Sequence, residues 1–289
     1  MSGVLRAVVE PGFFSSGPVQ VALAVSAAVA LLTSTLGVFT VIRGQSFAGH
    51  SLADIGATGG SGAFLIGAGP LWGFMVISIA AAGAMQAVGV ERQRGRDVAT
   101  GVVLGASLGL AALFLYWDST LHNSSGETYT ILFGSMLAIS PATVPAVLGL
   151  GAVALGVVAI IYRPLLLSSV NAELAAARGV PVRLVGAAYL LALAAAVALS
   201  CLAIGAILST ALLIGPAAAA LQLTKRPWRA IVGASVIALA ASWLGVLLSY
   251  DSYYWPPRGH SWPVSFFIVT LVFACYLAAR LVGSRGRRR

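Results

Sequence analysis

Charged residues are scarce in this chain, and acidic residues are the scarcest of them. Only 9% of the 289 residues are charged and 8 are Asp or Glu, against 59% that are hydrophobic. In soluble globular domains about a quarter of the residues carry a charge, so this composition excludes that class. No charged or low-complexity stretch of domain length interrupts the apolar runs, so we expect one transmembrane domain over residues 1–289, without a fused enzyme domain.

Cysteine is nearly absent as well. The two cysteines, Cys201 and Cys275, stand in separate apolar stretches and have no CxxC spacing. This argues against a disulfide framework, a zinc finger or a thioredoxin-type centre. We expect both to be small core residues.

The apolar runs are long. Most reach the roughly 20 residues that an α-helix needs to cross the hydrocarbon core of a membrane. Glycine-rich residues 56–62 make the second run irregular, and almost no polar residue separates the sixth run from the seventh. The sequence therefore predicts an all-α polytopic bundle of about 8–9 spans, near residues 18–41, 46–68, 70–90, 98–117, 141–162, 184–202, 203–222, 229–249 and 263–282.

Basic residues indicate the orientation of the bundle. If residues 91–96 are cytoplasmic, every Lys and Arg except Arg6 and Arg258 falls on the cytoplasmic side, including Arg43 and the basic tail at 283–289. Membrane proteins retain Lys and Arg on that side. We therefore predict an external N-terminus, a cytoplasmic C-terminus and a role for Arg43 as a cytoplasmic anchor. The net charge of +9 then fits anionic lipid and gives no support to nucleic-acid binding.

The external face would carry residues 118–130 and 250–262 as loops. Four ionisable residues in these segments are candidates for taking up a cation from outside: His122, Glu127, Asp251 and His260. Exposed loops also carry acids and histidines for solubility alone, and we favour that interpretation.

His50 and Asp54 lie four residues apart inside the second span. In an α-helix that spacing places both side chains on one face, about one turn apart. An imidazole nitrogen and a carboxylate oxygen suit Zn²⁺, and also Mn²⁺ or Fe²⁺, but two ligands are too few for a closed site. We therefore predict a metal half-site that a second copy of the chain completes. The alternative is a structural pair in which Asp54 accepts a hydrogen bond from His50; an ionisable residue in a membrane span favours the functional interpretation.

Residues 42–60, IRGQSFAGHSLADIGATGG, resemble the metal-path helix in the integral permeases of zinc/manganese ATP-binding cassette importers. That family usually has Asp first and His four residues later, whereas here His50 precedes Asp54. The resemblance implies that both residues are ligands for a transported ion, with their order exchanged by one helical turn.

Three further blocks resemble the family in the same order along the chain: ETYTILFGSMLAIS (127–140), NAELAAARGVPV (171–182) and AIGAILSTALLIGPAAAAL (203–221). Ser135 stands where the family usually has an acid. Four ordered blocks at the right separations are much harder to obtain by chance than one.

The resemblance implies a homodimeric permease in a bacterial plasma (inner) membrane, with the pathway between the two copies. Its implied partners are ABC ATPase subunits on the cytoplasmic side and an extracytoplasmic metal-binding protein. The permease itself would be no enzyme, because ATP hydrolysis belongs to the ATPase, and it would hold no permanent cofactor. Zinc is the first choice for the cargo, with manganese or iron as alternatives.

Residues 163–183 are predicted to form the longest cytoplasmic connection. Gly179 and Pro181 indicate the end of a short helix within it. In the family that these blocks resemble, this element couples the permease to the ATPase, which implies contact through four residues of this chain: Glu173, Ala177, Arg178 and Gly179. An amphipathic loop held at the lipid surface is the alternative.

The residues taken alone also allow two other classes of transporter. A secondary cation transporter or channel would use Asp54 without any ATPase and would respond to an ion gradient alone. An ATP-driven permease for siderophores or cobalamin would need a wide pathway. The His/Asp pair argues against the latter, because a bulky chelate hides its metal from protein ligands.

Overall fold

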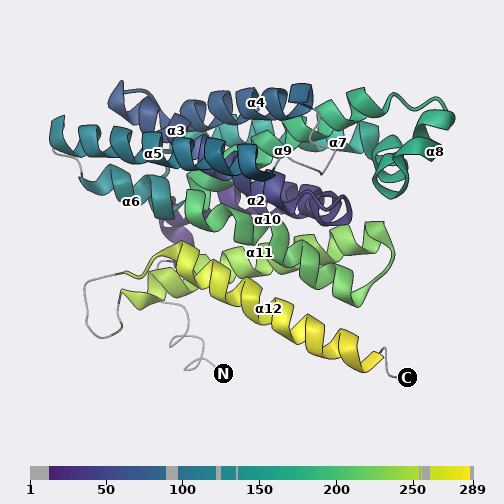
Figure 1. The fold of residues 1–289 in the computed structure, drawn as a ribbon. Coiled ribbons are helices and arrows are strands. Elements are labelled where there is room, and N and C mark those ends of the chain that lie inside the picture. Colours follow the sequence, from purple (N-terminus) through teal and green to yellow (C-terminus); the bar gives the residue numbers. More distant parts are fainter. Residues whose placement is uncertain are drawn as a thin grey trace, which may run out of the picture.

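The protein is a bundle of long helices (Figure 1). The computed structural model describes residues 13–88, 97–121, 125–134, 136–253, 255 and 261–286. The long helices are α2 (Gly17–Ile42), α3 (Ser46–Leu65), α4 (Pro70–Val88), α5 (Asp97–Leu121), α7 (Val144–Val170), α9 (Val182–Ile204), α10 (Ala206–Leu223), α11 (Pro227–Ser252) and α12 (Val264–Gly286). The short elements are η1 (Phe13–Ser15), α6 (Ser125–Phe133), η2 (Met136–Ala138), η3 (Pro141–Thr143) and α8 (Ala172–Ala177).

Every apolar stretch predicted from the sequence forms a helix, and the all-α polytopic class is confirmed. Within the described ranges, 8 helices are long and apolar enough to cross a membrane, and α3 is not among them. The 20 residues of α3 would extend about 30 Å, but its glycines, serines, His50 and Asp54 make it too polar. It nevertheless packs inside the bundle, against α4, α5, α9 and α10.

The second half of α9 forms the most buried part of the bundle. Residues 192–206 are all buried, and α9 packs against α2, α3, α4, α7 and α10. Gly205 alone separates α9 from α10, and its φ of 87° is one that residues with a Cβ rarely adopt. The two spans are therefore distinct helices joined by a one-residue turn, which explains the lack of polar residues between them.

Close helix contacts explain the glycines of α3. A Cβ at Gly59 would strike the carbonyl oxygen of Gly73 on α4, and a Cβ at Gly73 would strike that of Gly59. At Gly49 a Cβ would lie 2.6 Å from the Leu213 side chain on α10. Small residues thus bring α3 close to its neighbours, where larger side chains would separate the helices.

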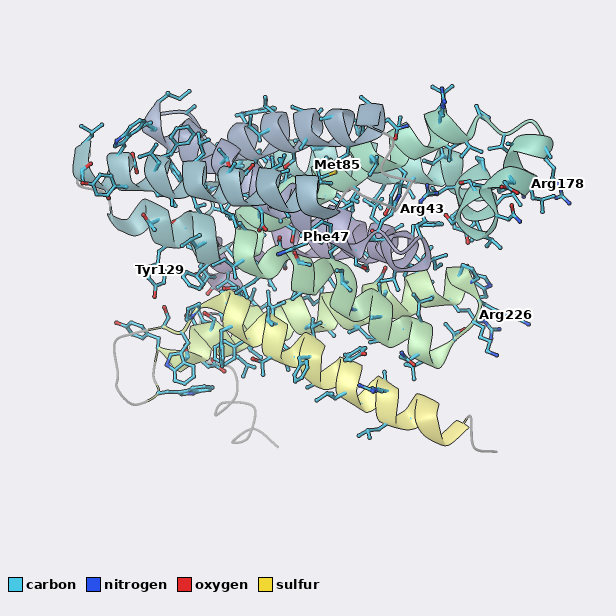
Figure 2. All side chains as sticks on the ribbon, in the orientation of Figure 1. Arg43, Phe47, Met85, Tyr129, Arg178 and Arg226 are labelled. Carbon is cyan, nitrogen blue, oxygen red and sulfur yellow. The ribbon has the colours of Figure 1, made fainter. Side chains whose placement is uncertain are left out.

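The two ends of the bundle differ in charge, as predicted. Arg178, just after α8, and Arg226, at the start of α11, lie at one end, while Tyr129 on α6 lies at the other (Figure 2). We refer to these as the α8 end and the α6 end. By the distribution of basic residues the α8 end faces the cytoplasm.

Parts of the predicted external loops belong to helices, which corrects the sequence interpretation for two acids. Asp118 belongs to α5 and is buried, and Asp251 belongs to α11 and is also buried. Solubility therefore does not account for these two acids. The burial of Cys201 agrees with its prediction, but Cys275 is exposed on α12, because it lies on the outward face of that helix.

Candidate functional site

His50 and Asp54 face each other on α3. Nε2 of His50 lies 3.4 Å from Oδ2 of Asp54, and 44% of the His50 side chain is exposed against 13% of that of Asp54. Phe47, three residues before His50, lies about midway along the bundle (Figure 2). The pair therefore lies far from both ends, with the imidazole accessible at the surface of this chain and the carboxylate largely covered.

Thr210 of α10 orients the imidazole. Its Oγ1 lies 3.1 Å from Nδ1 of His50. When Nδ1 donates its proton to this hydroxyl, Nε2 keeps a free lone pair on the side of Asp54. That tautomer is the one that binds a metal, and a partner on the other nitrogen commonly fixes it.

The separation of the two donor atoms suits a shared ion. Two ligands on a tetrahedral ion with bonds of about 2.0–2.2 Å stand about 3.4 Å apart. On an octahedral ion with bonds of about 2.1 Å, neighbouring ligands stand about 3.0 Å apart. The 3.4 Å between Nε2 and Oδ2 is close to both values, so one divalent ion can contact both atoms without a change in the backbone.

The pair supplies an incomplete ligand set. In the part of the chain that the structure describes, no group of three or more His, Cys, Asp or Glu side chains gathers where it could hold a metal ion. A closed site needs about four ligands, so further donors would have to come from water, from backbone or from another chain.

A cavity of about 390 Å³ opens beside Asp54. Its walls come from α3, α5, α6 and α10 and are mostly apolar, with Leu115, Ile131 and Ile207 among them. Hydroxyl groups line the part nearer the α6 end, on Tyr116, Ser119 and Thr128. The cavity therefore extends from the carboxylate towards the end of the molecule that we assign to the outside.

The predicted coupling segment, residues 163–183, includes the ends of two long helices. α7 continues to Val170 and α9 begins at Val182, so residues 171–181 connect the two helices. Residues 163–170 are the last turns of α7, with Leu165 fully buried. The short helix itself is confirmed as α8 (Ala172–Ala177).

Both ends of α8 are capped. The Asn171 side chain accepts a hydrogen bond from the backbone N–H of Leu174 at 2.8 Å, which is a typical N-cap. At the other end Gly179 has a φ of 80°, and the N–H of Val180 donates to the carbonyl of Ala175 at 3.0 Å, as in a glycine-terminated helix. Only Ala175 of the helix is buried.

The predicted coupling residues all lie on the exposed surface of this segment: Glu173, Ala177, Arg178 and Gly179. Figure 1 shows α8 protruding at its end of the bundle. Leu174 is also 45% exposed. A free surface of this kind is available to a partner protein.

Of the predicted external cation residues, the structure describes only the side chain of Asp251. Asp251 is buried near the end of α11. Glu127 belongs to α6, but its side chain lies outside what the structure describes, as do His122 and His260 altogether. Their role in metal uptake stays a prediction.

Sequence reasoning missed Thr210, Leu174 and the hydroxyl groups of the cavity. Thr210 lies within one of the blocks that carry the resemblance, AIGAILSTALLIGPAAAAL, which was the available signal. Nothing in that block indicates which side chain faces α3. That information comes from the packing of α10 against α3.

Three comparisons with known proteins bear on this geometry. A family model described as the ABC 3 transport family matches residues 17–279. The chain is 28% identical to the manganese transport system membrane protein MntC of Listeria innocua over 239 residues, which cover 83% of this chain and 84% of that protein. It is 27% identical over 228 residues to the high-affinity zinc uptake system membrane protein ZnuB of Haemophilus influenzae, covering 78% and 85%.

A solved structure shares the fold. The structure titled PsaBC from Streptococcus pneumoniae in complex with Fab contains a chain that superposes with a TM-score of 0.79 at 23% identity, covering 96% of this chain and 95% of that one. This supports the helical arrangement described above.

Proposed function

The chain belongs to the ABC 3 transport family, and from this premise we propose that it is the membrane permease of an ATP-binding cassette importer that carries Mn²⁺ or Zn²⁺ into the cytoplasm. As a family member it is a multi-pass bacterial membrane permease, and ATP hydrolysis belongs to a separate ATPase subunit. The alternative of a secondary transporter or channel finds no support in this family.

The observation that carries the proposal is the His50–Asp54 pair. Its donor atoms are 3.4 Å apart, the imidazole is accessible, and Asp54 borders a cavity that extends towards the α6 end. A dehydrated divalent ion cannot enter an apolar core without replacement ligands. This pair offers two such ligands about midway along the bundle.

We propose that a second copy of the chain completes the ligand set. His50 is accessible at the surface of one chain, so the imidazoles of two copies can approach one ion. On α5, Gly105 and Gly109 have no described atom within 4 Å of where a Cβ would stand. Such an uncovered small-residue face lets another helix come close, which supports a dimer.

The remaining partners follow from the importer class. We propose that α8 docks on the ATPase and that an extracytoplasmic metal-binding protein delivers the ion at the α6 end. Binding of ATP would draw the two ATPases together and, through α8, open the pathway outward; hydrolysis would return it inward. The ligands must hold the ion weakly enough for release.

The choice of metal is a proposal with two candidates. The sequence prediction placed zinc first, with manganese or iron as alternatives, because an imidazole and a carboxylate suit all three ions. Relatives named for manganese and for zinc both match this chain. One imidazole and one carboxylate per chain fit either ion.

The test is metal uptake by proteoliposomes that contain the permease with its ATPase and binding protein. Radioactive Mn²⁺, Zn²⁺ and Fe²⁺ are compared, alone and in competition, with ATP inside or absent. We expect ATP-dependent uptake of Mn²⁺ or Zn²⁺ and a loss of at least about tenfold in His50→Gln and Asp54→Asn, because each removes a direct ligand.

Ser51→Ala is the matched control. Ser51 is buried on α3, and its hydroxyl donates to the carbonyl of Phe47 on the same helix at 2.8 Å. Its uptake should stay near that of the wild type. Normal uptake by both ligand variants would remove the site assignment, and uptake driven by an ion gradient without ATP would remove the importer proposal.

A further inference from the structure

Arg43 is more than the cytoplasmic anchor that its sequence position suggests. It follows the last residue of α2, and α3 begins at Ser46. The residue is partly buried and its side chain contacts three other parts of the chain. In Figure 2 it lies towards the α8 end of the bundle.

The guanidinium of Arg43 binds the end of α7. Nη1 donates to Oγ of Ser168 at 3.3 Å and to Oγ of Ser169 at 3.4 Å. Both serine hydroxyls donate their own protons to the carbonyl of Leu165, so their oxygens are free to accept. One Nη carries two protons, which matches two acceptors, and Nε donates to the Gln45 side chain at 3.3 Å.

The same guanidinium contacts α9. Its carbon lies 5.2 Å from the centre of the Tyr189 ring, within the range of a cation–π interaction. Tyr189 is fully buried, and its hydroxyl shares a hydrogen bond with Thr40 of α2 at 2.7 Å. The turn between α2 and α3 is thereby fixed to both α7 and α9.

These contacts connect the two functional regions of the chain. Ser169 lies two residues before Asn171, which caps α8. Arg43 lies seven residues before His50 in the sequence, and Gln45 is the N-cap residue of α3. Movement of α8 that shifts the end of α7 would therefore reach the start of α3 through this side chain.

We propose that Arg43 is a positioning residue that couples α8 to the His50–Asp54 pair during transport. The proposal depends on the proposed importer function. It requires the planar guanidinium, because two hydroxyls, a carboxamide and an aromatic face are contacted at once. A lysine ammonium on its flexible stem cannot reproduce this fork.

The test uses the complete importer in proteoliposomes, with Arg43→Lys and Arg43→Ala. Uptake of Mn²⁺ and Zn²⁺, basal ATPase activity and the stimulation of ATPase by the metal-loaded binding protein are measured together. We expect complex assembly and the basal rate to stay within about twofold of wild type, while stimulation and uptake fall about fivefold to tenfold, the range of a typical coupling interaction. Arg43→Lys should not restore either.

The serine pair supplies a second, independent readout. Ser168→Ala combined with Ser169→Ala should lower stimulation in the same way, and adding Arg43→Ala should bring little further loss, because residues that act through one interaction are not additive. Arg280→Ala is the charge control: it removes an exposed arginine near the end of α12, and we expect it to couple normally.

Three outcomes would overturn the coupling role. They are full stimulation and uptake in Arg43→Lys, additive losses in the combined variant, or failure of the Arg43 variants to assemble with the ATPase. If the wild-type complex moved neither metal, the proposed function itself would fail, which is a result distinct from each of these.

Discussion

The His50–Asp54 pair and α8 have proposed roles in one transport cycle, but they are built in opposite ways. The pair lies inside α3, where glycines bring neighbouring helices into close contact. It depends on Thr210, 160 residues further along the chain. α8 is a helix of 6 residues that is capped by the residues directly next to it in the chain, and only its Ala175 is buried.

Because of this difference, effects on transport and effects on stability are easier to tell apart in α8 than in α3. A substitution in α3 changes a packed interior, so its effect on transport is mixed with its effect on stability. A substitution on the exposed face of α8 removes contacts available to a partner and leaves the bundle as it was. Variants of the two regions should therefore divide into those that lower stability and those that do not.

The largest effect is expected from Gly59→Leu on α3. A Cβ there would strike the Gly73 carbonyl and lie 2.7 Å from side-chain carbons of Ile77. Because α4 cannot move away without breaking its other contacts, overpacking should cost about 1–3 kcal/mol or more. We expect little folded protein in detergent, measured as monodisperse yield and thermal midpoint.

Gly149→Leu is the control for the effects that a change from glycine to leucine has on helix propensity and side-chain size. Gly149 lies on the exposed face of α7, with no described atom within 4 Å of its Cβ position. This variant should give a normal yield. Equal yields of the two leucine variants would contradict the close α3–α4 contact.

A smaller effect is expected from Thr210→Val. Valine keeps the shape of threonine but removes the hydroxyl that meets Nδ1 of His50. The imidazole would lose its fixed tautomer, and the loss of such a supporting partner typically lowers metal affinity about 10–100-fold. We expect uptake at limiting metal to fall about tenfold, with recovery at saturating metal.

Thr35→Val serves as the matched control, because Thr35 is on α2 and its hydroxyl donates to the carbonyl of Leu31 at 2.7 Å. Uptake by this variant should be unchanged at all metal concentrations. An unaltered apparent affinity in Thr210→Val would show that the imidazole is oriented by other groups.

Much of the fold follows from local sequence signals. The length and apolarity of the runs predicted every long helix, and Gly179 predicted the end of α8, because these depend on residues close in the chain. Hydropathy did not indicate that α7 continues to Val170, since it cannot distinguish a helix that leaves the membrane from one that ends there. It failed for Asp118 and Asp251 too, since burial of an acid depends on the helices around it.

The site was predictable only in part. The spacing of His50 and Asp54 predicted that they face each other, because one helix determines that geometry. The Thr210 contact, the cavity beside Asp54 and the serine partners of Arg43 each combine helices far apart in sequence. The hydrophobic periodicity of a single segment does not show which residues of other helices it will contact.

On α8, Glu173→Arg should reduce transport without reducing stability. Glu173 is exposed in the first turn, so reversing its charge would alter the electrostatic complementarity of the surface that we propose meets the ATPase. We expect the amount of co-purified ATPase or the stimulated ATPase rate to fall about fivefold, at an unchanged thermal midpoint of the permease. Glu173→Gln should show a weaker loss, and full coupled transport in Glu173→Arg would contradict the docking role.

The smallest effect is expected from Asn171→Ala. It removes the side chain that accepts from Leu174 N–H at 2.8 Å, and loss of an N-cap costs about 1 kcal/mol. Since α8 buries little, the cost should appear as faster hydrogen exchange of its amides, by about fivefold, and not in global unfolding. Asn171→Ser should retain the slower exchange. If exchange at the start of α3 also rose in Asn171→Ala, the two regions would be linked even at rest, and Arg43 would be the connection between them.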